Sequence, residues 1–343
     1  MAITTQTPFI TSSYARIIAR ELHLQERDLP ELLQGTGLPR SVLLPGDDTR
    51  ISGAQQVRII QNARRINTDP DLGLQIGRQL TPSAHGPIGY LALSSPDLLT
   101  ALLSLRDFLP LRIAIVQLGI EQTADWLRCT LQIRIAAPPE EKRMLTECFA
   151  LVLQSLVESI IGRPLDNARV EFEFDAPAYR AVYADYFHSP THFSCETSRV
   201  LLPAALAQTP NVAGDPGSYG MARDLCEQLL SQLPATSLSM TDRVRRRLLS
   251  MPAGLANEED VARALFVSKR TLARRLKKEG SGYRQIRDNL FAELAARHLR
   301  ESELSIEAIA ALLGYHDSAN FRRAFRRWFG ASPNAYRQAT ETA

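Results

Sequence analysis

A pattern of a short apolar helix, a tight turn and a cationic helix occurs twice within the last hundred or so residues. The first copy is EDVARALFVSKRTLARRLKKEG and the second is IEAIAALLGYHDSANFRRAFRRWFG. Leu272 and Leu276 of the first copy correspond to Phe321 and Phe325 of the second, 49 residues further along the chain. This is the layout of a helix-turn-helix, in which one helix supports another that enters the major groove of DNA. Two copies, joined by the helical stretch RQIRDNLFAELAARHLRE, restrict fold and function far more than one copy would.

The stretch SANFRRAFRRWFG, residues 318–330, separates into two faces when it is drawn as a helix of about 100° per residue. Its four aromatic rings fall within about a 100° arc and form the predicted buried face, while its four arginines lie opposite. Asp317 or Ser318 can cap the first turn, and Gly330 followed by Pro333 ends the helix. Most charged faces are simply solvated, but natural surfaces mix both signs and this stretch contains no acidic residue.

The DNA contacts that we predict depend on where each side chain lies on the outward face of the second helix of each pair. An arginine can donate two hydrogen bonds to O6 and N7 of guanine, worth about 1–3 kcal/mol of discrimination, whereas flanking cations contact phosphates without reading sequence. Arg274 and Arg323 are central on their faces and are the predicted base readers. Ser318 and Asn320, near a helix start, can reach bases or backbone. The full predicted set is Ser268, Lys269, Arg270, Thr271, Arg274, Lys277, Lys278, Ser318, Asn320, Arg322, Arg323, Arg326 and Arg327, with phosphate contacts expected at Lys277, Lys278, Arg322, Arg326 and Arg327.

Charge is distributed unevenly along the chain. The whole sequence has 40 Lys and Arg against 37 Asp and Glu, a formal net charge of +3. Residues 241–337 contain 20 basic against 11 acidic residues, a net of +9, whereas residues 1–240 contain 20 against 25, a net of −5. A basic domain of this size indicates a polyanionic partner, and nucleic acid is favoured over a membrane because the aromatic residues belong to a core face.

Residues 1–207 are expected to form an α+β domain. Helical periodicity occurs in SYARIIARELHL, LPELLQGTGLPRSVL, ISGAQQVRIIQNARRIN and SPDLLTALLSLRDFLPL, and from about Glu140 to Ile161. Alternation typical of strands occurs in IAIVQLGIEQTADWLRCTLQIRI, ARVEFEF and HFSCETSRVLL. The segment TDPDLGLQIGRQLTPSAHGPIGY is predicted to be rich in turns, and YRAVYADYFHSP to be a short helix.

Residues 208–235 are expected to be a linker followed by a connecting helix. QTPNVAGDPGS has the Pro and Gly content of a linker, and the stripe after it could belong to a core or to a dimer seam; its residues are Ala222, Leu225, Leu229 and Leu233. From residue 236 to residue 343 the pattern is entirely helical, with helix-turn-helix pairs at about 258–279 and 306–329. The predicted fold class is therefore an α+β domain followed by an all-α domain, whose two helix-turn-helix motifs are joined by a linker helix.

The carboxy-terminal part resembles the AraC/XylS family of transcription regulators. The resemblance is carried by SKRTLARRLKKEG, LSIEAIAALLGY and SANFRRAFRRWFGASPNAYR, and includes a closing G-x-S-P-x-x-Y-R signature from Gly330 to Arg337. It implies two recognition helices in successive major grooves, about 34–36 Å apart. Ala319 departs from the family pattern, since polar base readers are common at that position in relatives.

The amino-terminal stretch LGLQIGRQLTPSAHGPIGYLALSSPDLLTAL is similar to the arabinose-binding-type sensor domain of the ornithine-utilisation regulator branch. That branch lacks the jelly-roll sensor of the founding arabinose regulator, so the name implies no sugar ligand. The resemblance implies a bacterial, ligand-responsive activator of a catabolic or metabolic operon, with promoter DNA, RNA polymerase and a small-molecule effector as partners. The alternative is a ligand-independent regulator or a repressor, in which residues 1–207 serve dimerisation or protein interaction as a possible homodimer.

Catalysis and metal binding find little support in the first domain. GxGxxG, P-loop, GxSxG and HExxH motifs are absent, so we expect neither an enzyme nor a cofactor. The spacing of His188, His192 and Cys195 would suit ligands on a helix, but this stretch reads as a strand, where that spacing does not converge. Gly86 and Tyr90 are candidates for an effector pocket, although a demanding turn before a helix is the simpler interpretation.

The location that we expect is the bacterial cytoplasm, on the nucleoid. The four cysteines, Cys129, Cys148, Cys195 and Cys226, form no CxxC pair and fit a reducing compartment. The first residues, MAITTQTPFITSS, lack the regions of a signal peptide, and no stretch has 18 uninterrupted apolar residues. No membrane association is expected.

Overall fold

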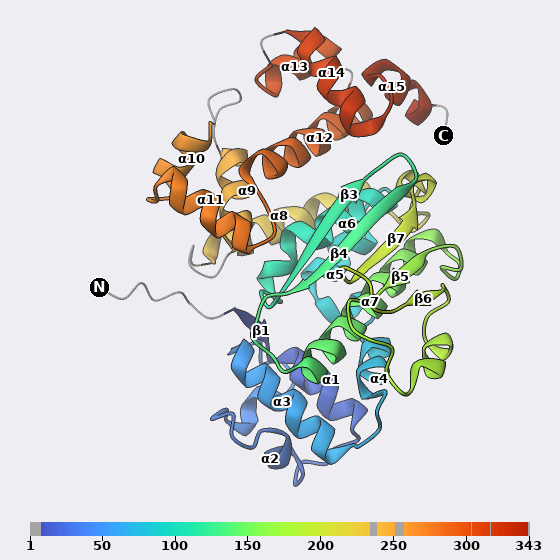
Figure 1. Cartoon of the computed structure of the whole chain (residues 1–343), viewed down its shortest axis with the longest axis vertical. Coiled ribbons are helices and arrows are strands. Elements are labelled where there is room, and N and C mark those ends of the chain that lie inside the picture. Colours follow the sequence, from blue (N-terminus) through green and yellow to red (C-terminus); the bar gives the residue numbers. More distant parts are fainter. Residues whose placement is uncertain (1–7, 234–238, 251–256, 303, 316, 342–343) are drawn as a thin grey trace. The chain divides into compact units, whose positions relative to one another are not determined.

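The computed structural model of the chain describes residues 8–233, 239–250, 257–302, 304–315 and 317–341 (Figure 1). It divides into two compact units near residue 237. The domain boundary that we expect between residues 235 and 236 falls outside the described residues.

The first unit is an α+β domain, as predicted. Its helices are α1 (Ser13–Glu21), α2 (Leu29–Leu32), α3 (Gly53–Ile66), α4 (Leu72–Gln79), α5 (Pro87–Leu93), α6 (Leu98–Phe108), α7 (Pro139–Ile161) and α8 (Pro216–Gln232). Its short 3-10 helices are η1 (Arg40–Leu43), η2 (Pro82–His85), η3 (Leu109–Leu111), η4 (Arg180–Asp185) and η5 (Ala204–Gln208). Its strands are β1 (Phe9–Thr11), β2 (Arg50–Ser52), β3 (Val116–Gln122), β4 (Trp126–Ile133), β5 (Arg169–Glu171), β6 (Thr191–His192) and β7 (Arg199–Pro203).

The main sheet of this unit has five strands in the order β3-β4-β7-β5-β6. Strand β7 is antiparallel to both β4 and β5, with Val200 opposite Cys129 on one side and Val170 on the other, while β5 and β6 run parallel. Strands β1 and β2 form a separate antiparallel pair. Buried and half-buried residues alternate along most of β4, as expected of a strand with one face on the core.

Helix α7 is the central helix of the first unit and packs against β4, β7 and α4. Pro138 precedes it, and Gly162 ends it with a left-handed φ of 70°. It is long and apolar enough to cross a membrane, but most of it is buried inside this unit, as in a core helix of a soluble protein.

The segment that we predicted to be rich in turns is instead mostly helical, because it contains α4, η2 and α5. The prediction was wrong because the segment is rich in glycine, and a glycine lowers the stability of a helix by up to about 1 kcal/mol relative to alanine. In the structure Gly73 and Gly77 face α7, where a Cβ on Gly77 would lie 2.9 Å from the Cα of Cys148. Close packing of two helices therefore compensates for the low helix propensity. The short helix predicted near residue 180 is the 3-10 helix η4.

The Pro/Gly-rich stretch before α8 is anchored to the first unit. The side-chain amide of Asn211 donates to the carbonyls of Leu93 and Ser95 at 2.6 and 2.8 Å, and Asp215 caps α8 by accepting from the backbone N–H of Ser218. Helix α8 then packs on α5 and α6. Of the stripe that we expected to be core or dimer seam, Ala222 and Leu233 are buried, Leu229 is half-buried and Leu225 is exposed.

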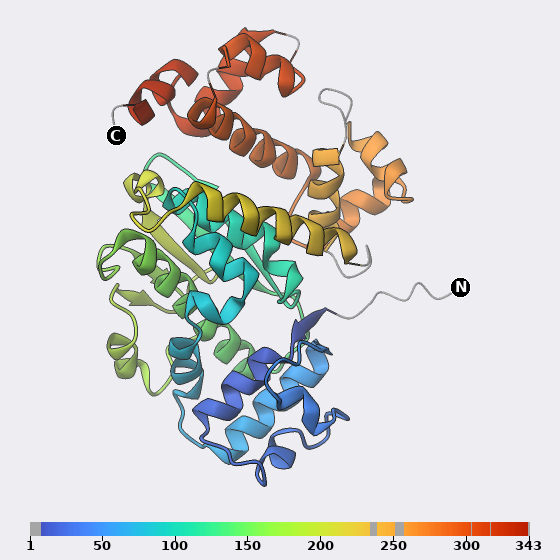
Figure 2. The ribbon, with the colours of Figure 1, turned by 180° about the vertical axis from the view of Figure 1, so that it is seen from behind.

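In the part that the structure describes, the second unit is entirely helical, as predicted. Its helices are α9 (Met240–Ser250), α10 (Glu258–Ala264), α11 (Lys269–Lys278), α12 (Tyr283–Glu301), α13 (Ile306–Leu312), α14 (Ser318–Phe329) and α15 (Pro333–Glu341). Helix α12 joins the pair α10 and α11 to the pair α13 and α14, which lie toward its opposite ends in both views (Figures 1 and 2). Each pair has its own apolar cluster, and Leu294 of α12 packs against both.

Candidate DNA-binding interface

The second helix of each pair, α11 or α14, begins at a residue whose side chain caps its first turn. The Ser268 hydroxyl accepts the backbone N–H of Thr271 at 3.2 Å, and the Asp317 carboxylate accepts that of Asn320 at 2.6 Å. Asp317 rather than Ser318 is thus the cap of α14, and Ser318 is its first residue. These hydrogen bonds fix where each helix starts, and so which of its residues face outward.

The inner face of each of these helices is held by two fully buried side chains. Leu272 and Leu276 hold α11, while Phe321 and Phe325 hold α14. Trp328 and Phe329 are only half-buried, so the prediction that all four rings of α14 form a buried face is wrong for these two. Both rings nevertheless pack against the apolar cluster beneath α14.

The outward face of α11 is cationic and largely unpaired. Within the described part of the chain, no side chain forms an ion pair or hydrogen bond with Arg270, Arg274, Lys277 or Lys278, and all four are exposed. Lys269 pairs with Glu258 of α10 at 3.4 Å, and the Thr271 hydroxyl lies 2.9 Å from that of Ser268. Lys269 therefore also joins the two helices of this motif, whereas Thr271 contacts the cap of its own helix.

The outward face of α14 is partly neutralised by acids from neighbouring helices. Arg322 pairs with Glu307 of α13 at 2.8 Å, and Arg327 donates to Asp288 of α12 at 3.2 Å. Arg326 has no partner among the side chains that the structure describes. A helical wheel of α14 alone cannot show these acids, because they reach it from other elements.

The two ion pairs on α14 differ in character. Arg322 and Glu307 are both well exposed, and pairs of this kind contribute little to stability, so a phosphate can displace the glutamate. Asp288 is mostly buried and also contacts Arg284 and Arg287 on its own helix. Arg327 therefore belongs to a network that fastens α14 to α12.

Arg323 is held toward the start of α14 by a chain of hydrogen bonds. Its guanidinium donates to the side-chain oxygen of Asn320 at 2.6 Å, and the Asn320 amide in turn donates to Asp317 at 2.7 Å. The N-terminal part of a recognition helix is the part that meets base edges. Asn320, which we predicted to touch DNA, orients Arg323 in this structure.

Three charged residues hold the framework of this unit. Glu279 accepts hydrogen bonds from the backbone N–H groups of Met240 and Thr241 and so closes the start of α9. Arg337 donates to the carbonyls of Leu299 and Leu304. Arg245 pairs with Glu293 of α12. A buried or half-buried charge of this kind gives no local sequence signal.

Two candidate residues of the first unit, Gly86 and Tyr90, are joined by a hydrogen bond from the backbone N–H of Tyr90 to the Gly86 carbonyl at 3.0 Å. Gly86 has a φ of 61° and precedes α5, whose Tyr90 is 52% exposed. His188 contacts Glu158 at 2.5 Å through Nδ1. Among the described residues, no three His, Cys, Asp or Glu side chains are grouped so that they could hold a metal ion.

Two capped helix pairs, joined by one helix and carrying exposed arginines opposite a buried face, define a DNA-binding transcription regulator. Comparison with known proteins gives the family. The arabinose-binding domain of AraC transcription regulators (N-terminal) matches residues 27–211, and a helix-turn-helix domain matches residues 261–339. The chain belongs to the AraC family of transcription regulators.

Several relatives match most of the chain. The chain is 32% identical to the ornithine utilization regulator of Pseudomonas aeruginosa over 302 aligned residues. These residues make up 88% of each protein. The chain is 26% identical over 295 residues to the HTH-type transcriptional regulator VirS of Mycobacterium tuberculosis, covering 85% of each. The crystal structure of the transcriptional regulator CdpR from Pseudomonas aeruginosa matches 91% of this chain and 97% of its own, with a TM-score of 0.44 and 23% identity.

Proposed function

We propose that the protein is a ligand-responsive transcription activator of a catabolic or metabolic operon, and that α11 and α14 read successive major grooves of promoter DNA. The observation that carries this proposal is the repeated cationic helix at the two ends of α12. The nineteen residues of α12 span about 28 Å, and successive major grooves lie 34–36 Å apart. Membership of a family of regulators implies a regulatory rather than a catalytic role.

Base reading is assigned to Arg274 and Arg323, and Ser318 contacts a base or the backbone beside Arg323. Phosphate contacts are assigned to Lys277, Lys278, Arg322 and Arg326, with Arg270 at the start of α11. The support for Arg323 is its hydrogen-bonded orientation, and the support for Arg274 is its exposed, unpaired guanidinium at the centre of α11. Ala319 offers no polar group, so the base nearest to it is read only through shape or methyl contact.

The test is a comparison of specific and random DNA. Operator sites would be selected from a random library with the full-length protein, and affinity measured by fluorescence anisotropy. We expect Arg323→Ala to lose about 5- to 150-fold on the selected site, with a much smaller loss on random DNA. Arg270→Ala is the matched control, with similar losses on both. Equal losses for Arg323→Ala on both DNAs would refute its assignment as a base reader.

The effector is assigned to the first unit, residues 1–207. The name of the Pseudomonas relative makes amino-acid catabolism one pathway to test, with ornithine as a first probe. An activator of this kind works on the nucleoid in the cytoplasm and acts on RNA polymerase. Transcription of a reporter behind the selected operator, with and without metabolites, tests the response and its direction.

A second function is favoured by an exposed apolar surface on α5 and α8. Met221 is 69% exposed and Leu225 is 45% exposed on α8, and Tyr90 is 52% exposed on α5, the helix on which α8 packs. Such a surface suits dimerisation in a regulator or repressor that needs no ligand. Sedimentation of the wild type and of Met221→Glu separates the two functions, since a monomeric wild type would remove this alternative.

A further inference from the structure

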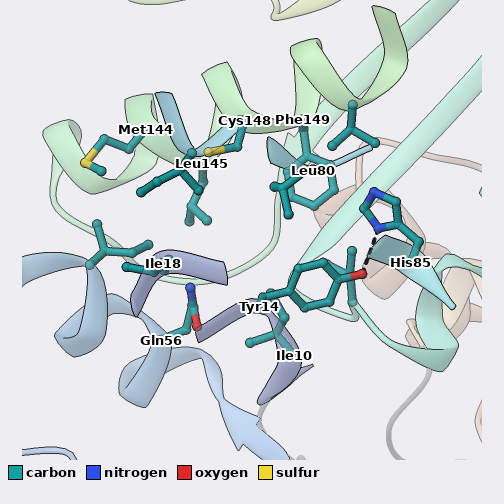
Figure 3. A pocket seen from close by; sticks show the side chains of 14 residues that line it. Ile10, Tyr14, Ile18, Gln56, Leu80, His85, Met144, Leu145, Cys148 and Phe149 are labelled. Carbon is teal, nitrogen blue, oxygen red and sulfur yellow. Dashed lines mark hydrogen bonds between the residues drawn. The ribbon is translucent and has the colours of Figure 1, made fainter. Parts of the chain in front are cut away.

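An internal cavity of about 40 Å³ lies in the first unit, enclosed mainly by α1, α3, α4 and α7 (Figure 3). All the side chains that line it are buried, and most of them are aliphatic, with Ile76 and Met144 among them. By the same measure a single water needs about 10–15 Å³, so the space admits about three water-sized groups. Met144 has three rotatable side-chain bonds and can give way to a somewhat larger guest.

Two polar atoms of the cavity wall form no hydrogen bond of good geometry among the described residues, although the Leu80 carbonyl lies near the His85 ring. They are Nε2 of His85, a residue 3% exposed, and Oε1 of Gln56, a residue 2% exposed. Figure 3 shows the two side chains on opposite sides of the cavity, with the Tyr14 ring between them. A buried polar atom without a partner costs free energy, and a bound molecule that supplied the partner would recover it.

The hydrogen bond between Tyr14 and His85 sets which proton the histidine offers. The Tyr14 hydroxyl lies 2.8 Å from Nδ1 of His85, and the Arg112 guanidinium lies close to the same hydroxyl. A guanidinium can only donate, so the tyrosine oxygen accepts from it and keeps its own proton available for Nδ1. In the tautomer in which Nδ1 accepts that proton, His85 carries its ring proton on Nε2, and this atom is a hydrogen-bond donor in the cavity wall.

The cavity wall is electrically neutral. Burial lowers the pKa of His85 to about 4, and the opposing effect of the Leu80 carbonyl is smaller, so the ring is uncharged at neutral pH. Burial also raises the pKa of the Tyr14 hydroxyl, and the lining residues include no Asp, Glu, Lys or Arg. A zwitterion or carboxylate would lose its hydration here without gaining a counter-charge.

We propose that this cavity is the effector site of the regulator, and that it takes a small, uncharged, mainly apolar molecule with a hydrogen-bond acceptor for Nε2 of His85. Gln56, whose amide can either accept or donate, binds a second polar group of the ligand or the same one. The assignment rests on the proposed ligand-responsive function. It excludes free amino acids such as ornithine as occupants of this cavity.

The test uses the full-length protein with labelled Ile and Met methyl groups and cyclopentanone as the probe. We expect saturable shifts of the methyl NMR signals of Ile76 and Met144, with those of Ile306 and Ile309 unchanged in the second unit. Methylcyclopentane, which has no acceptor, should bind more weakly, and ornithine should cause no shift at Ile76 or Met144. Shifts from ornithine but not from cyclopentanone would overturn the proposal, as would ordered water that no uncharged probe displaces.

Two variants check the site without relying on loss of fold. Gln56→Leu removes the unpaired amide, so we expect an unchanged or higher melting temperature with an affinity for cyclopentanone about 2- to 10-fold weaker if the amide contacts the probe. Val152→Leu adds one carbon to a wall of the cavity and should abolish binding while the protein stays folded. Undiminished binding in both variants, with their melting temperatures retained, places the probe elsewhere and refutes the site.

Operator binding measured in parallel separates this proposal from the proposed function. Specific DNA binding without any effect of cyclopentanone on operator affinity or on reporter transcription refutes the effector site and leaves the regulator intact. Failure of the unliganded wild type to prefer its selected site over random DNA refutes the DNA-reading function itself. A change in operator affinity that Val152→Leu abolishes supports both.

Discussion

Salt dependence offers the sharpest test of how the arginines of α14 are used. Arg326 and Arg327 are neighbours on the same exposed face, and sequence alone assigns both to phosphate. In the structure Arg326 is unpaired among the described side chains, whereas Arg327 is bound to the mostly buried Asp288 of α12. We therefore expect Arg326→Ala to remove a phosphate contact, and Arg327→Ala to loosen α14 from α12 with little change in counterion release.

The size of the effect follows from the number of phosphates neutralised. Each one contributes about 0.9 to the slope of log K against log salt concentration. Five contacts, from Arg270, Lys277, Lys278, Arg322 and Arg326, predict a slope of about −4.5. Arg326→Ala should bring it to about −3.6, while Arg327→Ala should leave it near −4.5 and instead lower the melting temperature.

Affinities for one operator would be measured by fluorescence anisotropy at several salt concentrations, for the wild type and both variants. Asp288→Asn is the matched control, because it releases Arg327 and should make the slope steeper. A fall of about 0.9 in both arginine variants would refute the distinction between a free and a fastened arginine. An unchanged slope in both would remove Arg326 from the phosphate contacts.

Three further predictions concern stability. Burial raises the pKa of Glu147 to about 7, so the folded chain keeps a proton that the unfolded chain releases above about 4.5. The free energy of unfolding, measured by urea titration, should therefore fall by about 3 kcal/mol as pH rises from about 4.5 to 7, and Glu147→Gln should abolish that fall. A wild-type free energy of unfolding that does not change over this pH range would contradict the raised pKa. Phe325→Ala should destabilise the second unit by about 3–5 kcal/mol and Trp328→Ala, whose ring is half-buried, by clearly less, so equal losses in thermal unfolding would contradict their burial. Phe266 is 96% exposed with a φ of 56°, so Phe266→Gly should relieve strain and raise the free energy of unfolding by up to about 1 kcal/mol, and a loss would show that the ring stabilises the turn.

The parts of the fold that the sequence predicts well are those with a strong local signal. Helix α14 has a cap, a two-sided pattern and a terminating glycine in one short stretch, and all three appear in the structure. Helix α4 was missed because its glycines are turn signals by propensity, and only contact with α7 explains them. A helix whose stability comes from residues close in sequence can be predicted, whereas a helix that depends on packing against a distant segment cannot.

The candidate sites show the same division. The outward positions of Arg274 and Arg323 follow from periodicity, but the acids Glu307 and Asp288 that reach α14 come from other helices. The cavity could not be predicted from the sequence, because Tyr14, Gln56 and His85 come from three separate elements and share no motif. The turn that drew attention to Gly86 lies one residue from His85, while Gly86 and Tyr90 are not among the residues that line the cavity.

The two recognition helices differ in how firmly their cations are held, and this difference predicts a division of labour. Arg323 is fixed through Asn320 and Asp317, so it loses little side-chain entropy on binding, whereas Arg274 has no such support. Base changes in the half-site of α14 should therefore cost more affinity than changes in that of α11. In Asn320→Ala this discrimination should weaken while the salt slope stays unchanged. A selected operator with its stronger sequence preference in the half-site of α11, located by crosslinking from each helix, would contradict this division.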